Sequence, residues 1–584
     1  MRITMTTTQR TGIRRELEAA QNGAADASLR SPVDWRSIDW KQANRNVRRL
    51  QMRIVQAQQQ NKKRKVRALQ FILTRSYSAR CLAVRRVTEN SGRRTAGVDG
   101  QKLDTPQQKA QAVVNLSTED YQAQPLKRIS IPKQNGKLRP LGIPTMQDRA
   151  HQALHLFALE PIAETTADPN SYGFRKERSV ADAIEQCCNI LSRSTSAQWI
   201  LEGDIQSCFD EISHEWLLVH TPMDRTILRK WLKAGLIEQG VYQPTTAGTP
   251  QGGIISPALM NLTLDGLEPL LGEHFPRHSG KQVKLVRYAD DFIITGRRKE
   301  ILENEVTPLI VEFLKERGLK LSENKTRITH IAEGFDFLGK RIRKYGGKFL
   351  TKPSRENVKT FLREVKATVG QHLHSPVEKL LLTLNPMIRG WALFHRTSAS
   401  KKTFQKVDSY IFCELRRWMK RRHPCKTLSW CYKKYLTRVG NRNYVLQGTI
   451  PDRRGKPRTL RLIKATDVPI KRHVKIKATA NPYDPKWETY FEERMALQMK
   501  ENLHGYDKLL RLWFNQDGRC PQCGEKITRE TGWHLHHRVR VVNGGDDSMA
   551  NLILMHPTCH QQLHAQTDKR LVFNCSTASS KEGV

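Results

Sequence analysis

Short apolar runs that end in acidic residues mark the middle of the chain. Residues 283–296 place two β-prone runs on either side of Asp290 and Asp291. Runs of this length around a polar pair predict a β-hairpin with both carboxylates at its tip. A third acid, Asp204, ends another short apolar run over residues 199–203. We therefore expect strands that carry acidic side chains at their ends.

Apolar residues at helical spacing dominate the first part of the chain. Residues 39–86 are rich in Arg, Lys and Gln, and their Val, Leu and Ile positions predict two or three basic helices. These helices present either a solvated charged face or a surface for a nucleic-acid backbone, and the total charge favours the second. Residues 129–144 predict a strand, an Asn-Gly turn and a strand, with Lys133 and Arg139 on one side near the tip.

The pattern changes again in the second half of the chain. Residues 355–440 predict helices in which aromatic and basic residues interleave. Aromatic residues at helical spacing belong more often to a core than to a base-stacking platform. We therefore assign Trp391, Trp418 and Trp430 to packing, and the neighbouring Arg and Lys side chains to phosphate contacts. Residues 445–500 are basic and irregular, and on sequence alone they form a linker-rich small domain.

Composition limits the classes of partner. The 584 residues include 99 Lys and Arg against 57 Asp and Glu, which gives a net charge of +42 and a pI near 10.1. This excess argues for a polyanionic partner, with a merely basic protein of the ribosomal type as the alternative. The length predicts several domains.

The sequence argues against a membrane span and a secretory signal, and less strongly against a transit peptide. No run of 18 apolar residues exists, so we expect no membrane partner. Residues 1–30 lack the apolar stretch of a secretory signal, and Glu16, Glu18 and Asp26 count against a transit peptide. The eleven scattered cysteines are typical of a reducing compartment. We expect a cytoplasmic protein, associated with the nucleoid in a bacterium, with an organelle as the alternative.

The paired acids predict a metal site. Neighbouring carboxylates repel each other unless a cation lies between them, and hard oxygen ligands suit Mg²⁺. Together with Asp204, Asp290 and Asp291 could hold two Mg²⁺ ions roughly 3.5–4 Å apart, which would activate a primer 3′-hydroxyl and stabilise the leaving pyrophosphate. For the acid pair alone, ordinary turn residues are the simpler interpretation.

Cysteine and histidine spacing predicts a second metal region near the C-terminus. Cys520 and Cys523 are answered by His556 and Cys559, and two pairs with ligands three apart suit tetrahedral Zn²⁺. One Cys-x-x-Cys pair alone would also fit a redox site. The adjacent residues His536 and His537 lie between the pairs, Asn551 follows them, and His560 and His564 lie four apart on the expected last helix.

These motifs, in this order, resemble the proteins encoded by bacterial and organellar group II introns, which are reverse transcriptases with maturase activity. The resemblance extends from about residue 39 to residue 564. It implies a multidomain α+β protein with a right-hand polymerase, an α-helical thumb and a small C-terminal nuclease of the ββα-metal fold. The expected parts are a flexible segment (1–36), fingers (37–181), palm (182–345, closed by 335–339), maturase or thumb domain (346–444), DNA-binding region (445–500), HNH endonuclease domain (501–570) and tail (571–584).

The resemblance also implies roles in the polymerase. Asp204, Asp290 and Asp291 would be the catalytic carboxylates, with Ile205 counted as a fourth residue of the Mg²⁺ site. Lys133 would hold the triphosphate of the incoming nucleotide. The other residues expected at the nucleotide are Arg139, Phe209 and Gln251.

Two of these assignments carry an open point. Phe209 would block a ribose 2′-hydroxyl and so select deoxynucleotides, but a core phenylalanine is nearly as good an interpretation. Residues 171–175 match a family motif that usually continues with Pro-Gly, whereas this chain has Lys176-Glu177. This departure puts the local loop geometry in doubt, but not the activity.

The C-terminal segment resembles HNH nucleases. This implies that His537 is the general base that activates water, because a neutral imidazole near pH 7 suits that role. His536 and His560 would hold Mg²⁺ or Mn²⁺, with His564 as a candidate third ligand, and Asn551 would orient the active-site loop. A single zinc knob is the weaker alternative, because there are too many ligands for one tetrahedral ion.

Together these inferences predict a multifunctional retroelement protein. We expect an RNA-directed DNA polymerase and maturase that binds its intron RNA, nicks double-stranded target DNA and extends the new 3′ end with deoxynucleoside triphosphates. One rival is a splicing factor whose polymerase site has decayed, which the three intact acids argue against. The other is a homing HNH nuclease with an RNA-binding body, which the full set of nucleotide-site residues argues against.

Overall fold

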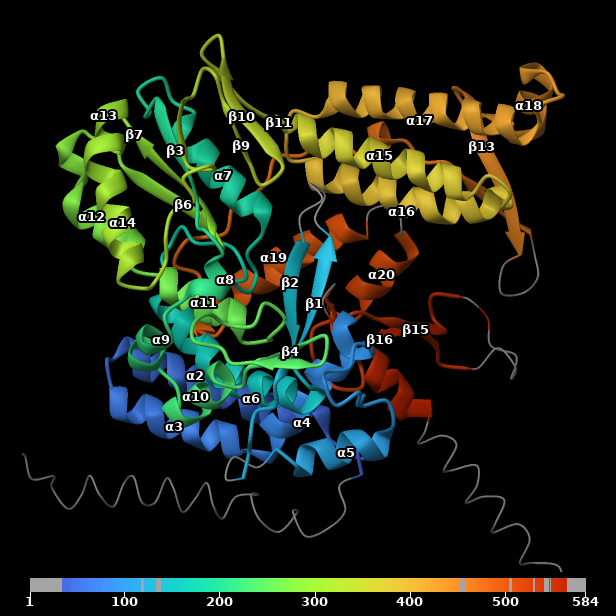
Figure 1. Cartoon of the computed structure of the whole chain (residues 1–584). Helices are drawn as coiled ribbons and strands as arrows, with labels where there is room; N and C mark the ends of the chain where they lie inside the picture. Colours follow the sequence, from blue (N-terminus) through green and yellow to red (C-terminus); the bar gives the residue numbers. More distant parts are fainter. Residues whose placement is uncertain are drawn as a thin grey trace, which may run out of the picture.

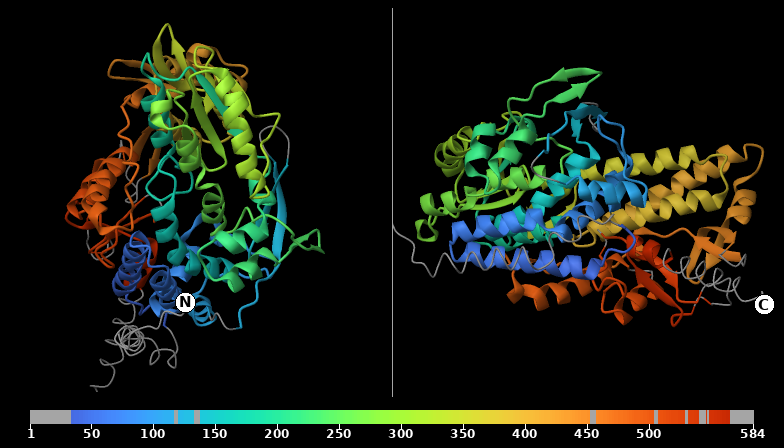
Figure 2. Two further views of the ribbon diagram at one scale, coloured as in Figure 1. Left: turned by 90° about the vertical axis from the view of Figure 1, so that its left-hand side faces the viewer. Right: turned by 90° about the horizontal axis from the view of Figure 1, so that it is seen from below.

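The computed structural model of the protein describes residues 34–116, 120–132, 138–451, 457–503, 507–528, 531–539, 546 and 548–564. Figure 1 shows long helices, drawn in yellow and orange, that lie side by side and project from a larger body of sheets and helices. The views in Figure 2 place the C-terminal segment against the N-terminal helices, although these are far apart in the sequence. Almost all of the expected N-terminal segment, the expected tail and Lys133 lie outside the described residues.

The N-terminal part contains three basic helices, at the upper end of the predicted number. They are α2 (Trp40–Gln59), α3 (Lys63–Arg75) and α4 (Tyr77–Glu89). The Asp39 side chain caps α2 by accepting a hydrogen bond from the main-chain N–H of Gln42. Two further helices follow, α5 (Pro106–Val114) and α6 (Met146–Thr166). α6 is buried along most of its length and contacts α2, α3 and α4, so it forms the centre of the fingers.

The predicted hairpin over residues 129–144 is present. β1 (Leu126–Pro132) pairs antiparallel with β2 (Leu138–Ile143). β1 also pairs in parallel with β4 (Leu236–Glu238), which in turn pairs with β5 (Val241–Gln243). The strand order β2-β1-β4-β5 therefore joins the fingers hairpin to a segment that comes after the first palm strand.

A four-stranded antiparallel sheet forms the palm, with strand order β6-β7-β3-β8. Its strands are β3 (Trp199–Asp204), β6 (Lys284–Tyr288), β7 (Asp291–Gly296) and β8 (Arg327–His330). Ile293 and Ile294 are both fully buried, so the central strand has apolar packing on both faces. The surrounding helices are α7 (Val180–Leu191), α8 (Cys208–Glu211), α9 (His214–His220), α10 (Arg225–Leu232), α11 (Ser256–Leu264), α12 (Leu267–His274), α13 (Lys299–Ile301) and α14 (Thr307–Lys315).

Residues 335–339 do not close the palm sheet as expected. β9 (Phe335–Phe337) pairs with β10 (Lys340–Tyr345), which pairs with β11 (Lys348–Pro353) in a separate three-stranded sheet. The palm sheet ends instead at β8. The apolar pattern of residues 335–339 identifies a strand correctly, but it carries no information on which strand is the partner.

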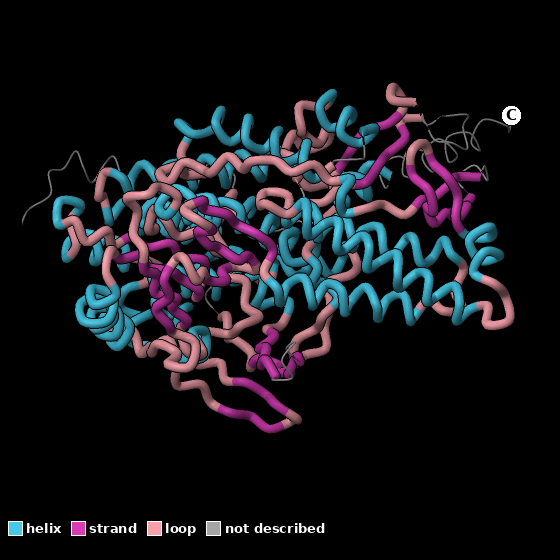
Figure 3. The backbone as a smooth tube through the Cα atoms, turned by 90° about the horizontal axis from the view of Figure 1, so that it is seen from above, coloured by secondary structure: helices cyan, strands magenta, loops and turns pink. Residues whose placement is uncertain are grey.

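The helical prediction for residues 355–440 is confirmed up to Tyr435. The helices are α15 (Arg355–Gln371), α16 (Val377–His395), α17 (Lys401–Arg422) and α18 (Leu428–Tyr435), and Figure 3 shows long helices that lie side by side at the right of the view. Trp418 is 2% exposed and Trp391 stacks on Phe361 at 4.7 Å, as the packing assignment requires. Trp430 corrects that assignment, because it is 36% exposed with Lys434 over its ring.

The expected small domain over residues 445–500 is wrong, because these residues pack on three other parts of the protein. β12 (Leu436–Val439), β13 (Arg442–Pro451) and β14 (Pro457–Arg461) form a sheet, and residues 446, 465 and 468 belong to the thumb core. Residues 476, 480 and 491 belong to the palm core, and residues 495, 499 and 503 to the fingers core. Apolar residues are too sparse in this segment to form a separate core.

We call residues 471–503 the strap, because this segment crosses from the thumb over the palm to the fingers. The Asp182 carboxylate anchors it by accepting hydrogen bonds from the Ile476 N–H (2.7 Å) and from Arg494 (2.6 Å). His473 lies 2.9 Å from the same carboxylate. Although burial acts against the charge, these partners hold the pKa of Asp182 down at about 2. The strap ends in α19 (Glu488–Asn502).

Several expected domain boundaries fall inside elements of structure. The 181/182 boundary lies in α7, the 444/445 boundary in β13 and the 500/501 boundary in α19, while 345/346 lies in the β10–β11 turn. Main-chain hydrogen bonds cross each of these points. The motifs locate the parts of the chain correctly, but they do not mark where one part ends.

The C-terminal part packs on the fingers. It contains α20 (Asp507–Asn515), an antiparallel pair of β15 (His534–His537) and β16 (Leu552–Met555), and a helical segment over residues 557–564. Trp513, Leu552 and Leu554 share one buried cluster with residues of α2 and α4. In the part of the chain that the structure describes, no helix is long and apolar enough to cross a membrane.

Candidate functional site

Three carboxylates lie at one edge of the palm sheet. β3 and β7 are antiparallel, and their register pairs Asp204 with Asp291. Asp290 lies in the turn between β6 and β7, next to Ala289, whose φ of 59° is left-handed. The predicted hairpin is therefore present, and strand pairing brings Asp204 to it from a distant part of the sequence.

The electrostatics of this group favour a bound cation. Burial, followed by the charges of Asp290 and Asp204, raises the pKa of Asp291 to about 6. Burial also raises the pKa of Asp290, although a main-chain hydrogen bond acts against this, and Asp204 raises it further. Carboxylate oxygens are the ligands that Mg²⁺ prefers, so the donors fit the expected ion. The Ile205 side chain is a hydrocarbon without a ligand atom, so only its main-chain carbonyl is a candidate metal ligand.

Lys325 is a functional candidate that the sequence did not single out. Its ammonium donates a hydrogen bond of 2.8 Å to Asp204 Oδ2, and this bond is the main cause of its raised pKa. The side chain is 66% exposed, so it is free to move away. A single lysine in the loop between α14 and β8 gives no local signal. Only the closing of Ile205 against Leu321 as a β-bridge brings this loop to the acids.

The expected nucleotide pocket is partly assembled. Phe209 is 7% exposed and lies edge-to-face with Phe174 at 6.4 Å, so it belongs to the core, in the helix α8 that follows β3. Its carbonyl accepts a hydrogen bond from the Thr249 N–H at 2.6 Å. Gly248 is required here: its φ is +85°, and a Cβ at this position would lie 2.6 Å from the Asp210 carbonyl.

Arg139 and Gln251 meet, although they lie in different regions of the sequence. The Arg139 guanidinium Nε donates to Gln251 Oε1 at 2.9 Å, and this contact joins the fingers hairpin to the palm loop. The Gln251 amide also contacts Asp210 at 3.4 Å. Lys133 lies between β1 and β2 in the sequence, outside the described residues, so the structure does not place it.

The four expected zinc ligands converge in the C-terminal part. Ligand atoms of Cys520, Cys523, His556 and Cys559 all lie within 4.8 Å of one another, and all four residues are buried. His556 Nδ1 lies 3.2 Å from Cys523 Sγ, while its Nε2 lies 3.1 Å from the Lys526 carbonyl. That carbonyl fixes the tautomer in which Nδ1 is the free ligand atom. Three sulfurs and one nitrogen suit tetrahedral Zn²⁺.

A second group consists of histidines alone. Among the described residues, His536, His560 and His564 bring their ligand atoms within 4.8 Å of one another. Burial, followed by the neighbouring imidazoles, lowers the pKa of His560 to about 4, so it is a neutral ligand near pH 7. His537 comes directly after His536 in β15, so its side chain leaves the opposite face of the strand.

Asn551 holds the loop after β15. Its side-chain amide accepts a hydrogen bond from the Val539 N–H at 2.7 Å and donates to the Val539 and Asp546 carbonyls at 3.0 and 2.7 Å. Its carbonyl accepts from the Arg538 N–H. These contacts join Arg538 and Val539, which directly follow β15, to Asp546 and Asn551.

Comparison with known protein families matches four consecutive parts of the chain. Residues 35–116 match the N-terminal domain of reverse transcriptase, and residues 131–342 match reverse transcriptase (RNA-dependent DNA polymerase). Residues 358–436 match the group II intron maturase-specific domain, and residues 520–566 match HNH endonuclease.

Curated relatives agree with these matches. Protein YkfC of Escherichia coli is 34% identical over 44% of this chain and 79% of its own length. The group II intron-encoded protein LtrA of Lactococcus lactis is 31% identical over 45% of this chain. The chain belongs to the group II intron-encoded reverse transcriptases. It spans about half (54%) of the length of LtrA.

Solved structures with some likeness in shape add little to this assignment. A telomerase from Candida albicans, solved with a fragment of telomeric RNA, shares 12% identity and covers 53% of this chain and 64% of its own, with a TM-score of 0.31. At that score the likeness carries no argument about this group II intron protein.

The loop that departs from the family pattern is well held. Glu177 has a φ of +61°, the left-handed region that glycine adopts freely, and the family usually places glycine here. Arg175 and Arg178 both pair with Glu164 at 2.9 Å, and Arg175 also donates to the Asp168 carbonyl. These buried contacts fix the position of the loop. The departure from Pro-Gly therefore affects the backbone strain at Glu177 and not where the loop lies.

His534 is a second candidate that sequence reasoning missed. Its Nδ1 lies 3.4 Å from Nδ1 of His560, on the side of that ring away from His564, whose Nε2 lies 3.2 Å from His560 Nε2. The spacing of His534 and His536, two apart in a strand, was the available signal, because alternate residues share a face.

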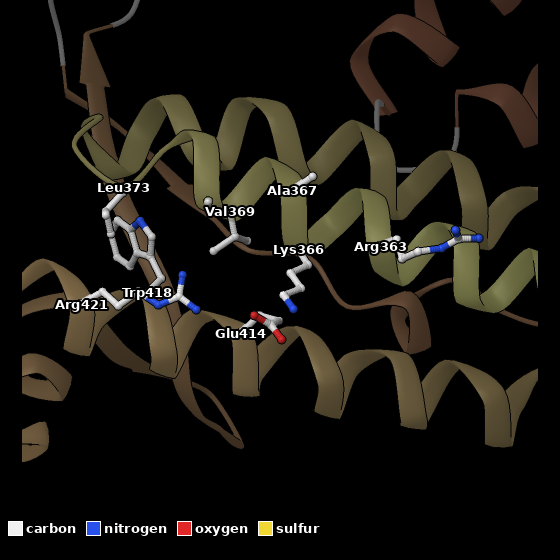
Figure 4. A pocket seen from close by; sticks show the side chains of 9 residues that line it. Arg363, Lys366, Ala367, Val369, Leu373, Glu414, Trp418 and Arg421 are labelled. Carbon is white, nitrogen blue, oxygen red and sulfur yellow. The ribbon is translucent and has the colours of Figure 1, made fainter. Parts of the chain in front are cut away.

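The thumb carries a basic groove between α15 and α17, with a volume of about 300 Å³ (Figure 4). Val369, Leu373 and Trp418 form its apolar wall. Its cationic residues are Arg363, Lys366 and Arg421. Ala367 and Gly370 on α15 leave the space between the helices open.

Proposed function

We propose that this protein copies intron RNA into DNA at Asp204, Asp290 and Asp291. The pairing of Asp204 with Asp291 across β3 and β7 supports this proposal most directly, because it assembles a site for two metal ions. Two Mg²⁺ ions bound there would activate the primer 3′-hydroxyl and stabilise the pyrophosphate. Lys325 holds Asp204 until the ions bind and then releases it.

The nucleotide pocket gives the reaction its substrate class. Phe209 closes the space beside the sugar, which disfavours a 2′-hydroxyl and favours deoxynucleoside triphosphates. Arg139 and Lys133 supply fixed cations for the phosphates, and Gln251 lines the base side of the pocket. The Arg139–Gln251 hydrogen bond keeps the fingers hairpin in position for this role.

Loss of one carboxylate tests the polymerase assignment. Asp290→Asn keeps the size of the side chain but removes the charge that holds the metal. We expect primer extension on an RNA template to be abolished, while RNA binding stays within about twofold of the unmodified protein. His537→Ala is the control, because it changes the proposed nuclease site in the C-terminal part and not the palm. Extension by Asp290→Asn at a near-normal rate would contradict the site.

The maturase function belongs to the thumb and to the overall charge. We propose that the thumb, the fingers helices and the groove cations bind phosphates of intron RNA, so that the RNA folds and performs its own splicing. Each neutralised phosphate lowers log K by roughly 0.7–0.9 per tenfold increase in salt. Replacing Arg363, Lys366 and Arg421 by Ala should therefore reduce the salt slope by up to about 2–3. An unchanged slope in a salt titration would exclude this groove as a contact surface.

The C-terminal part supplies the nuclease. We propose that His536, His560 and His564 hold a divalent ion, Mg²⁺ or Mn²⁺, at the scissile phosphate of double-stranded target DNA. His537 takes a proton from the attacking water, and Asn551 fixes the adjoining loop. The strand pair β15–β16 and the helix over residues 557–564 support a ββα-metal arrangement, and Zn²⁺ on the three cysteines and His556 stabilises it.

The strap is our candidate for the DNA-binding region. It lies between the thumb and the nuclease and contacts both the palm and the fingers. Nicking would leave a 3′ end that the polymerase extends on the intron RNA. We place this activity in the cytoplasm, at the nucleoid of a bacterium, because LtrA is a bacterial protein.

A further inference from the structure

An arginine of the fingers reaches the zinc ligands of the C-terminal part. Arg85 lies in α4, and its guanidinium Nη2 is 3.8 Å from Cys559 Sγ. The Arg85 side chain is 9% exposed. It is fixed by Glu89, which accepts two hydrogen bonds of 3.2 Å from its Nε, and it lies over the Trp40 ring.

The charge of the zinc centre explains why a cation is needed there. Three thiolates and a neutral histidine around Zn²⁺ carry a net charge of −1, because zinc ligands bind in their deprotonated forms. A buried charge without a partner costs several kcal/mol. The Arg85 guanidinium, which lies 3.8 Å from Cys559 Sγ, supplies a compensating positive charge at the thiolates.

The surroundings of the zinc ligands belong to both regions. Cys520, Cys523 and Cys559 are members of the same buried cluster as Trp40 and Cys81 of the fingers helices. On either side of the Arg85 contact, Thr558 donates a hydrogen bond to Glu89, and Gln562 donates to the Trp35 carbonyl at 3.3 Å. The helical segment over residues 557–564, which carries Cys559, therefore packs directly on the fingers.

We propose that the zinc centre is a joint between the polymerase fingers and the nuclease, in which Arg85 is the positioning residue that balances the charge of the thiolates. The joint holds the nuclease at a fixed place on the polymerase. Loss of zinc then loosens α4 as well as the C-terminal part. This role extends beyond the stabilisation of the nuclease alone.

Zinc release tests the role of Arg85 on the full-length protein. Arg85→Met keeps a long side chain but removes the charge, and we expect zinc transfer to a colorimetric chelator to become 10–100-fold faster, the usual effect of losing an outer-shell partner. The Arg85→Lys variant should release zinc at a rate between those of the unmodified protein and Arg85→Met. Arg86→Met is the matched control, because Arg86 is the next residue of α4 and pairs with Glu160 at 3.3 Å. Zinc release from Arg85→Met at the unmodified rate would overturn the proposal.

Hydrogen exchange of the unmodified protein tests the joint even if Arg85→Met fails to fold. Removal of zinc should speed amide exchange in α4 by at least about tenfold, because the buried face of that helix loses its partner. Peptides from α15 serve as the internal reference, because they lie in the thumb core. Unchanged protection of α4 after zinc removal, or a purified protein without one equivalent of zinc, would overturn the proposal.

Discussion

In the palm, Asp204 meets Asp291 only because β3 pairs with β7, and Lys325 joins them from a third segment. In the C-terminal part, Cys520 and Cys523 lie one turn apart, and His556 and Cys559 repeat the same spacing. One metal site is thus assembled by the tertiary fold and the other largely by local sequence. The difference teaches that a local motif names its ligands in advance, whereas a distributed site reveals its helpers only in the structure.

The largest expected effect tests whether the nuclease site and the polymerase site work independently of each other. His537→Ala should lower nicking of target DNA by 10²–10⁴-fold, the usual loss for a general base. Primer extension on a supplied primer should stay near normal, because His537 belongs to β15 and the acids to the palm sheet. Assays of nicking and extension on one protein preparation check this.

The result of these assays tests the role of His537 and the independence of the two sites separately. Normal nicking by His537→Ala would contradict the assignment of His537 as the general base. Loss of extension would show that the two sites depend on each other chemically and not only through packing. Bound zinc should stay at one equivalent in either case, because His537 is not a zinc ligand.

A smaller effect is expected from His534. It lies 3.4 Å from His560 Nδ1 and would orient that ring toward the proposed ion, so His534→Ala should weaken binding of Mn²⁺ by roughly 10–100-fold. His534→Asn should restore part of the affinity, because its side chain also offers a hydrogen-bond acceptor. Calorimetric titration measures both variants. Equal Mn²⁺ affinity in His534→Ala and the unmodified protein would remove His534 from this role.

The smallest effect concerns backbone strain at Glu177, in the loop that follows residues 171–175. Glu177 holds a left-handed φ of +61°, which costs a non-glycine residue of order 1 kcal/mol. Glu177→Gly should therefore raise the free energy of unfolding by up to about 1 kcal/mol, less the entropy that glycine adds to the unfolded chain. Urea unfolding measures this. Destabilisation by more than about 1 kcal/mol would mean that the Glu177 side chain contributes more than its strain costs.

Local patterns predicted the elements well. The hairpin at Asp290, the helices before residue 90 and those of the thumb follow from apolar spacing alone, as do the four zinc ligands from their own spacing. Roles such as those of Phe209 and Gln251 came from the family resemblance. The sequence did not predict the Lys325–Asp204 pair or the Arg85–Cys559 contact, because each joins residues whose proximity depends on tertiary packing.

The segment over residues 445–500 shows the opposite failure. Its irregular pattern suggested a region apart, yet its few apolar residues are distributed over the cores of three neighbours. A segment that uses the cores of others has no periodicity of its own. Its one strong signal was charge, and charge does not distinguish a solvated linker from Arg494 buried against Asp182.

The strap also decides where such a protein can be shortened. A cut before Arg494 would leave the Asp182 carboxylate buried without its guanidinium partner, at the point where that carboxylate caps α7. A cut after Leu503 would keep this ion pair and the fingers contacts of α19, but with the metal ligands it would remove the C-terminal part that helps to bury α4. A shortened protein that keeps the Asp182 ion pair would therefore end beyond the strap, whether it is made in the laboratory or arises in a lineage that loses its nuclease.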